Sequence, residues 1–316
     1  MVSKKRKSKV ISIVVPTYNE EENVLALSQA VVETLKEIPN YEYELLFIDN
    51  CSTDNTQKII AEMCKQNSKI KAIFNAKNFG PFNSPYYGLC QANGDCAILL
   101  CADFQDPIEL IPQFIAEWEN GYKIVCGIKT KSKENKIVYA IRSLYYKMIR
   151  WMSDVEQIEH FTGFGLYDRS FLDILRGLDD TNPFLRGIVA ELGAKRKDIP
   201  YVQQKRRAGK SNYNFYKLYD AAMLSFTSYT KIGLRLATFF GFILSVISFI
   251  IGLAYLVLKL MYWDRFLAGT APMLIGIFFF GAIQLFFIGL LGEYVLNINV
   301  RVMKRPLVIE EDRINF

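Results

Sequence analysis

The sequence of 316 residues contains a single histidine, His160, and this scarcity excludes several kinds of site. A metal site built on two imidazoles is excluded, and a Ser-His-Asp triad would have to use that one residue. The six cysteines include no C-x-x-C pair, which argues against a zinc site. Most of them lie in apolar runs, and this indicates small core residues in a reducing compartment.

Two phosphate-binding signatures are also missing. No G-x-G-x-x-G follows the first strand-like run, which argues against a dinucleotide-dependent dehydrogenase, and no G-x-x-x-x-G-K-[ST] occurs, which excludes a P-loop. The first residues, MVSKKRKSKV, are basic but contain no apolar stretch of the kind found in a signal peptide. We expect residues 1–9 to form a solvated basic tail, with attachment to anionic lipid as the alternative.

Two long stretches, residues 236–258 and 266–292, carry no charged residue. A helix needs about 20 apolar residues to cross a bilayer, so both stretches are long enough. We therefore predict a transmembrane hairpin over 233–299, with spans at about 234–260 and 268–296; two buried core helices are the alternative. Basic residues flank both spans, so the positive-inside rule places both termini in the cytoplasm.

The preceding part of the chain alternates between strand-like and helix-like patterns. Apolar strand-like runs and amphipathic helical runs follow one another, which is typical of a doubly wound α/β domain. The expected strands are 9–16, 43–49, 70–74, 96–101 and 123–127, and the expected helices are 20–37, 56–66, 80–92 and 108–120. We place this domain at residues 10–211.

Polar residues follow three of the expected strands directly. Ligands bind such sheets beyond the carboxyl ends of the strands, so residues 18–20, 49–50 and 103–106 should share one crevice. Carboxylate and amide oxygens there suit a hard divalent cation that bridges to a diphosphate. Turn and capping chemistry is the alternative for the same oxygens, which belong to Asp49, Asp54, Asp103, Gln105 and Asp106.

The order and spacing of several motifs resemble those of inverting family-two glycosyltransferases of the GT-A fold. The branch that they resemble transfers sugars to polyprenyl phosphates and includes dolichyl-phosphate mannose synthases and bactoprenol glucosyltransferases. The resemblance covers nearly the whole chain, from VVPTYNEEEN, FIDNCSTDNT, NFGPFNSPYYGL and GDCAILLCADFQDPIE through GLYDRSFLDIL, FLRGIVAELG and KRRAGKSNY to GEYV and KRP. It implies a Rossmann-like, mostly parallel sheet followed by the membrane hairpin.

The resemblance also implies roles for single residues. The nucleotide sugar would be held by Pro16, Tyr18, Glu20, Asp49 and Lys129. Asp103 would act in catalysis and, with Gln105, hold Mg²⁺ or Mn²⁺ on the donor diphosphate. The phosphate of the lipid acceptor would be bound by Arg206, Lys210 and Ser211, although these charges could instead only set the topology. Residues 212–232 are expected to form an amphipathic helix at the membrane interface, and residues 300–316 a cytoplasmic tail.

Three positions depart from the family pattern. Asn50 replaces the second of two aspartates, Cys101 replaces an aspartate next to the metal ligand, and Gly163 stands where the proposed catalytic base is found. Cysteine is a poor ligand for Mg²⁺, so we expect Cys101 to pack instead. Glu159 or His160 could replace the base, although a lone histidine is more often structural.

Together these features predict a membrane-bound glycosyltransferase on the cytoplasmic face of a bacterial plasma membrane. It would move a hexose or N-acetylhexosamine from a UDP-sugar to undecaprenyl phosphate, and a flippase and a second glycosyltransferase would then use the product. A homo-oligomer could shield the membrane face. The basic residues cluster at 1–10 and 195–210, so nucleic acid is not needed as a partner. A hydroxyl acceptor, or a scaffold protein without turnover, are the alternatives.

Overall fold

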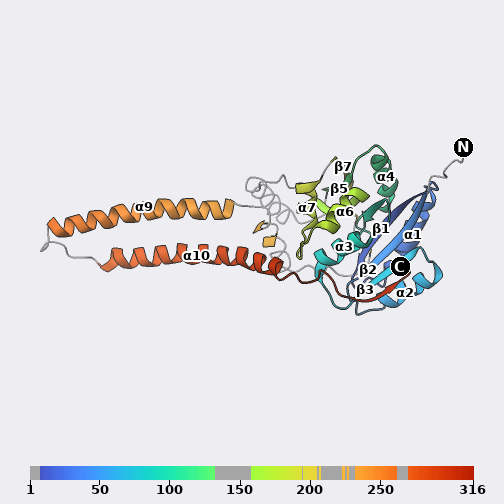
Figure 1. The fold of residues 1–316 in the computed structure, drawn as a ribbon, viewed down its shortest axis with the longest axis horizontal. Coiled ribbons are helices and arrows are strands. Elements are labelled where there is room, and N and C mark those ends of the chain that lie inside the picture. Colours follow the sequence, from blue (N-terminus) through green and yellow to red (C-terminus); the bar gives the residue numbers. More distant parts are fainter. Residues whose placement is uncertain are drawn as a thin grey trace.

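In the computed structural model, the described part of the chain comprises residues 8–131, 158–193, 195–204, 206–207, 223–224, 226–227, 232–261 and 270–316. An α/β domain lies at one end of the molecule, and two long helices project from it side by side (Figure 1). The sheet of this domain has the strand order β7-β5-β6-β4-β1-β2-β3-β8 within the described residues.

The strands follow the apolar runs of the sequence. Their bounds are β1 (Lys9–Thr17), β2 (Tyr41–Asp49), β3 (Ile70–Asn75), β4 (Cys96–Leu99), β5 (Ile124–Lys131), β6 (Phe161–Asp168), β7 (Arg196–Val202) and β8 (Glu310–Ile314). Strand β6 runs antiparallel to β4 and β5, and β8 runs antiparallel to β3, whereas the other pairs are parallel. The predicted α/β domain with a mostly parallel sheet is confirmed.

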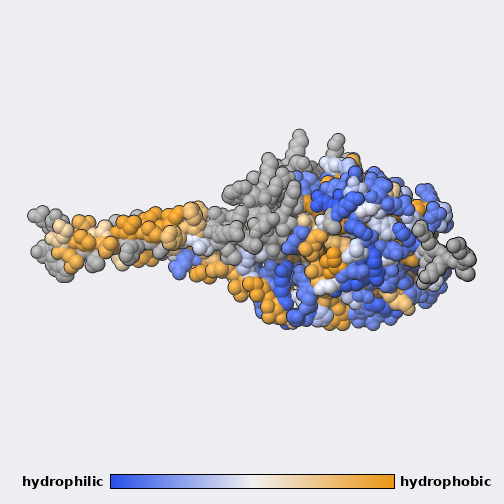
Figure 2. Space-filling view, turned by 45° about the horizontal axis from the view of Figure 1, so that its top comes forward, coloured by the Kyte–Doolittle hydropathy of each residue, from blue (hydrophilic) through white to orange (hydrophobic). Residues whose placement is uncertain are grey.

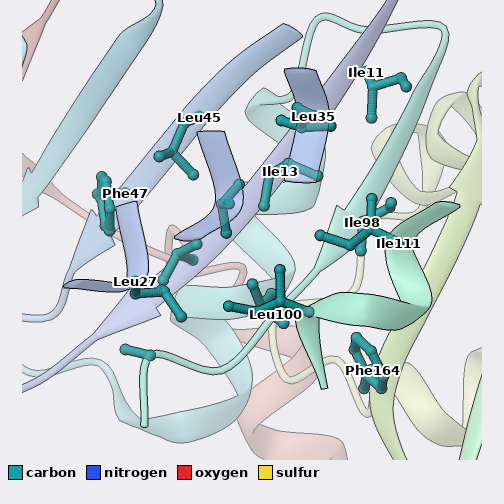
Figure 3. Packing of buried hydrophobic residues seen from close by; sticks show 14 of the residues in the cluster. Ile11, Ile13, Leu27, Leu35, Leu45, Phe47, Ile98, Leu100, Ile111 and Phe164 are labelled. Atoms are coloured by element: carbon teal, nitrogen blue, oxygen red, sulfur yellow. The ribbon is translucent and has the colours of Figure 1, made fainter. Parts of the chain in front are cut away.

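Helices cover both faces of the sheet. They are α1 (Val24–Lys36), α2 (Thr56–Gln66), α3 (Gly80–Gln91), the 3₁₀ helix η1 (Ile108–Leu110), α4 (Ile111–Glu119), α6 (Arg169–Gly177) and α7 (Leu185–Leu192). Since successive side chains of a strand point to opposite faces, strands such as β1 contribute to two cores. Ile11 and Ile13 of β1 pack with Leu27 of α1 (Figure 3), whereas Val14 faces the core that includes Leu89 of α3.

The last strand of the sheet comes from the end of the chain. Strand β8 pairs with β3, where Ile73 lies opposite Arg313 and Ala72 opposite Ile314. The side-chain amide of Asn315 donates to the carbonyl oxygens of Cys64 and Ile70 at 2.7 and 2.8 Å. The expected tail at 300–316 therefore adds an edge strand to the domain that begins the chain, and this was not predicted.

The projecting helices are α9 (Ile232–Met261) and α10 (Thr270–Val302). Apolar residues cover the described surface of both (Figure 2), and Phe242 and Leu285 are 69% and 71% exposed. Within the described residues, the segment Phe279–Val302 of α10 is long and apolar enough to cross a membrane, and none of its most apolar window is buried.

The end of α10 contacts the α/β domain. Thr181 donates a hydrogen bond from Oγ1 to the carbonyl oxygen of Val300 at 3.1 Å. Arg301 pairs with Asp180 at 3.5 Å, and Lys304 pairs with the neighbouring Asp179. These contacts and β8 together hold the domain at the base of the projecting helices.

Candidate functional site

Most of the predicted site residues that the structure describes lie at one edge of the sheet. Strands β1, β2 and β4 are parallel, so the segments that follow them, 18–20, 49–50 and 103–106, lie beyond the same edge. Strand β6 begins at this edge because it is antiparallel to β4, with Leu99 opposite Gly165. The turn that holds Glu159 and His160 therefore reaches the same edge of the sheet.

Four residues other than glycine adopt a left-handed backbone at this edge. Asn19, Cys51, Phe104 and His160 have φ angles of 56°, 62°, 61° and 58°, and each lies one or two residues from a predicted site residue. Such conformations are uncommon outside glycine and concentrate at functional sites, where the surroundings hold them in place. The backbone thus supports a site at this position independently of the motifs.

The loops after β1 and β2 are joined by side-chain hydrogen bonds. The backbone N–H of Asn19 donates to Ser52 Oγ at 2.9 Å, and the Asn19 side chain accepts from the N–H of Thr53 at 2.8 Å. The N–H of Glu20 donates to Thr56 Oγ1 at 2.8 Å. A hollow of about 190 Å³ lies beside this junction and is lined by Asn19, Glu20, Glu21, Glu22, Asn23 and Asp54.

Asp49 stabilises the loop after β2 by accepting hydrogen bonds from it. It is fully buried, and its carboxylate accepts from the N–H of Ser52 at 2.9 Å and from Gln57 Nε2 at 2.8 Å. The hydroxyls of Ser52 and Thr17 also donate to it. Asp49 therefore positions the 50–57 loop, and sequence reasoning missed Ser52 and Gln57 because their role depends on this contact. Pro16 lies next to it in the sheet, paired with Ile48, and Tyr18 follows.

Asn50 is equally engaged with the loop after β3. Its Oδ1 accepts from the N–H of Phe79 at 2.8 Å and from Asn75 Nδ2 at 3.2 Å. Its own Nδ2 donates to Asn78 Oδ1 at 3.0 Å and to the carbonyl oxygen of Gly80 at 3.2 Å. These two acceptor oxygens need an N–H donor, which an aspartate side chain could not supply. The loop therefore requires asparagine at position 50.

A cluster of two carboxylates and a guanidinium lies across the crevice. Arg206 pairs with Asp103 Oδ2 at 2.9 Å and with Glu20 Oε1 at 3.9 Å. Burial raises the pKa of Glu20 and Asp103 raises it further, while the hydrogen bond from Asn23 and the charge of Arg206 act to lower it. Asp103, Glu20 and Arg206 are therefore brought together, although they belong to segments far apart in the sequence.

The backbone around Arg206 is docked on the Asp103 turn. The N–H of Gln204 donates to the carbonyl oxygen of Gln105, and that of Arg207 to the carbonyl oxygen of Asp103, both at 3.3 Å. The guanidinium of Arg207 lies 5.1 Å from the ring centre of Phe104. The other two residues expected to bind the lipid phosphate, Lys210 and Ser211, lie outside the described residues.

The oxygens of this turn suit a divalent cation that a diphosphate also binds. Mg²⁺ is usually held by one or two carboxylates together with substrate phosphates and water, and Asp103 and Gln105 can supply protein oxygens of this kind. The guanidinium already held between two carboxylates shows that the cluster accommodates positive charge. No group of three or more acidic, cysteine or histidine side chains that could hold a metal alone occurs in the described part of the chain.

Cys101 does not pack as expected. Residue 101 lies beyond the end of β4 at Leu99, where Cys101 is exposed and forms no disulfide, and its thiol hydrogen-bonds with the carboxylate of Asp106. Its backbone N–H donates to the carboxylate of Asp106 at 3.1 Å, and the other oxygen of that carboxylate accepts from the hydroxyl of Tyr201 at 3.1 Å. Asp106 therefore connects the Asp103 turn to β7.

The position of the family's proposed base has a backbone that favours glycine. Gly163 has a φ of +105°, and a Cβ built there would lie 3.5 Å from Leu99 Cδ2 and 3.8 Å from Leu185 Cδ2. A side chain at this position would meet apolar atoms. Lys129 and His160 are adjacent across β5 and the start of β6, where the N–H of Lys129 donates to the carbonyl oxygen of His160 at 3.3 Å.

Comparison with known proteins gives both family and relatives. Residues 12–175 match the profile of glycosyl transferase family 2. The chain is 31% identical to the prophage bactoprenol glucosyl transferase homolog of Escherichia coli K12 over 300 residues, which are 95% of this chain and 97% of that protein. It is 32% identical to the bactoprenol glucosyl transferase of Shigella phage SfII, again over 300 residues, covering 95% and 96% of the two chains.

Among solved structures, the chain is similar to glucosyl-3-phosphoglycerate synthase of Mycobacterium tuberculosis in complex with Mn²⁺, UDP and phosphoglyceric acid. The identity is 16%, the TM-score is 0.45, and the match covers 69% of this chain and 76% of that one.

Proposed function

Since this chain belongs to glycosyl transferase family 2 and is a glycosyltransferase, we propose that it transfers a hexose or an N-acetylhexosamine from a UDP-sugar to a polyprenyl phosphate, with inversion. The names of the near-full-length relatives support a bactoprenol acceptor. The observation that carries the proposal is the contact between Asp103 and Arg206, because it joins the donor side of the crevice to the basic segment that leads towards α9.

In this proposal the donor lies along the carboxyl edge of the sheet. Pro16, Tyr18 and Glu20 contact the nucleotide, Asp49 positions the loop beside it, and Lys129 approaches the sugar diphosphate from β5. Asp103 and Gln105 would hold Mg²⁺ or Mn²⁺, and the cation would supply positive charge to balance that of the departing diphosphate. Asp49 positions this loop and does not contact the uridine directly in this proposal, because its oxygens already accept hydrogen bonds from Ser52 and Gln57.

The acceptor phosphate is met by Arg206, Lys210 and Ser211. A phosphate monoester has a second pKa of about 6, so much of it is already a dianion at neutral pH and needs no base. Its oxygen forms a bond to the anomeric carbon on the face opposite the departing UDP, while the bond from that carbon to the diphosphate breaks. This explains how the chain can act with Gly163 at the usual base position. Glu159 and His160 then bind or orient the sugar.

The helices α9 and α10 form a hairpin in the cytoplasmic membrane in this proposal, with the catalytic domain and both termini on the cytoplasmic side. The exposed apolar surface of both helices and the length of Phe279–Val302 support it. Alkaline phosphatase fused at residue 265 should be active in a bacterial periplasm, whereas a fusion after Phe316 should be inactive. Equal activity of the two fusions would contradict the hairpin.

The transfer is tested with purified full-length protein, undecaprenyl phosphate, Mn²⁺ and a panel of UDP- and GDP-sugars. One donor should yield UDP and a glycolipid that mild acid cleaves, as detected by mass spectrometry. Asp103→Asn should abolish the product, and Glu109→Gln, which removes an exposed carboxylate of η1, should not. A glycolipid stable to mild acid would indicate a hydroxyl acceptor, and donor binding without release of UDP would indicate a scaffold protein.

A further inference from the structure

The contact between Arg206 and the two carboxylates also affects how this site binds a metal cation. The side chains of Asp103, Glu20 and Arg206 are only 8%, 12% and 27% exposed, so water screens these charges weakly. Two carboxylates that face one crevice repel each other unless a cation lies between them. In this structure the cation between them is the guanidinium of Arg206.

Both oxygens of Asp103 are occupied in this arrangement. Oδ1 accepts from the backbone N–H of Gln105 at 3.1 Å, and Oδ2 faces the guanidinium of Arg206 at 2.9 Å. A divalent cation binds a carboxylate oxygen at about 2.0–2.1 Å, so a cation on Oδ2 would lie beside the guanidinium and be repelled by its charge. The guanidinium and the cation therefore compete for Asp103.

We propose that Arg206 competes with the divalent cation for Asp103, and that the cation, on binding with the donor, releases Arg206 towards the acceptor phosphate. This inference rests on the proposed function, because it takes Asp103 as the metal ligand. Arg206 then serves the two substrates in sequence: it neutralises the empty donor site first, and it turns to the acceptor only when the donor site is filled.

The packing of the neighbouring residues allows such a release. The backbone hydrogen bonds from Gln204 and Arg207 to the Asp103 turn are both 3.3 Å long, whereas the ion pair of Arg206 with Asp103 is 2.9 Å long. Losing this ion pair would weaken the attachment of Arg206 to the turn. The described residues thus connect the filling of the donor site to the segment that leads towards the membrane helices.

The competition should change the affinity for Mn²⁺ by a measurable factor. Losing one hydrogen bond between charged groups corresponds to a change in affinity of about tenfold or more. Because the ion pair between Arg206 and Asp103 must break when Mn²⁺ binds, it should weaken the affinity for Mn²⁺ alone by about tenfold or more. A variant without the guanidinium should not have this loss of affinity.

The test is a titration of full-length protein with Mn²⁺ in the absence of nucleotide, in which electron paramagnetic resonance measures free Mn²⁺. Arg206→Gln should bind Mn²⁺ about tenfold more tightly than the wild type, and Arg206→Lys should stay close to the wild type because it keeps the charge. Arg207→Gln removes the same charge one residue away, where the guanidinium faces Phe104, and should change the affinity little. Thermal melting of each variant confirms that it is folded.

The outcomes separate this inference from the proposed function. If Asp103→Asn abolishes Mn²⁺ binding while Arg206→Gln binds as weakly as the wild type, the competition is wrong and the metal site remains. If Arg206→Gln and Arg207→Gln tighten binding equally, the effect is one of general charge, and the competition is again wrong. If no variant binds Mn²⁺ either alone or in the presence of UDP, both the competition and the proposed metal site are wrong.

Discussion

Tyr87 donates a hydrogen bond from its hydroxyl to Oε1 of Glu310 at 2.7 Å, although 223 residues separate them along the chain. Tyr87 lies on α3 and Glu310 begins β8, so this bond fastens the end of the chain to the α/β domain. Burial raises the pKa of Tyr87 to about 12, and the nearby carboxylate of Glu310 contributes. Arg313 pairs with the same carboxylate, which therefore serves two partners.

Glu310→Gln should lower the stability of the domain. The substitution removes the charge that both Tyr87 and Arg313 use, and we expect a loss of about 1 kcal/mol, or a fall in melting temperature of about 2–4 °C. Glu311→Gln makes the same change at the exposed neighbouring position and should have little effect. Scanning fluorimetry at pH 7 compares the two variants. Equal melting temperatures would show that the Tyr87–Glu310 bond does not hold β8.

Asn50→Asp should destabilise the loop after β3, even though the family usually has aspartate at this position. The aspartate would direct an oxygen at Asn78 Oδ1 and the carbonyl oxygen of Gly80, where Asn50 now donates two hydrogen bonds. Asn50 is only 6% exposed, so the loss should be about 2–4 kcal/mol. Asn40→Asp introduces the same charge in an exposed turn and is the control. Chemical denaturation measures both, and a wild-type midpoint for Asn50→Asp would contradict the assigned amide orientation.

The strands and helices of the first half of the domain could be predicted from periodicity, because their apolar residues alternate or recur in register with the sheet. The helix at 56–66 was predicted at its observed bounds, and β1 within one residue. Strand β8 could not be predicted, because its sequence, EEDRI, is charged and lies at an edge where one side of the strand faces water. It is a strand because β3 offers an unpaired edge.

The sequence predicted which residues lie near the site but not which of their side chains contact one another. The order of motifs places Glu20 and Asp103 at one edge of the sheet, since that follows from parallel strands. The contact of Arg206 with both carboxylates depends on where this side chain lies after β7, and nothing in the local sequence specifies that position. Cys101 was expected to pack because cysteine is a poor ligand for Mg²⁺, but β4 ends two residues earlier and Cys101 is exposed.

Gly163→Ala should destabilise the domain, and Gly163→Glu should not create a base that raises activity. The φ of +105° at this position strains any side chain, and the added Cβ would meet Leu99 and Leu185. We expect a loss of about 1–3 kcal/mol for the alanine variant. Gly177→Ala is the control, because nothing lies within 4 Å of a Cβ at the end of α6. Denaturant midpoints and turnover are measured together; an undiminished midpoint with higher turnover in Gly163→Glu would contradict this view of the position.

Asp168 should make the domain sensitive to acid. Its carboxylate accepts from Trp118 Nε1 at 2.7 Å, from Lys123 Nζ at 2.9 Å and from the backbone N–H of Ser170 at 3.0 Å. Burial raises the pKa of Asp168, but hydrogen bonds from Ser170, Trp118 and Lys123 outweigh burial and lower the pKa to about 2. Because the folded pKa lies below the unfolded value of about 3.9, the ionised form stabilises the fold above pH 4.

This stabilisation should disappear as the pH falls from about 4 to 2. Asp168→Asn keeps a side chain that can cap α6, so it removes mainly the charge, and we expect it to cost about 1–2 kcal/mol at pH 7 after allowing for solvent screening. Tryptophan fluorescence in a denaturant series at several pH values measures the free energy of unfolding of both proteins. The difference between them should shrink below pH 4, whereas Asp198→Asn, at an exposed ion pair with Arg196, should differ little from the wild type at any pH. A difference that stays constant from pH 7 to pH 3 would mean that Asp168 contributes through shape and not through its charge.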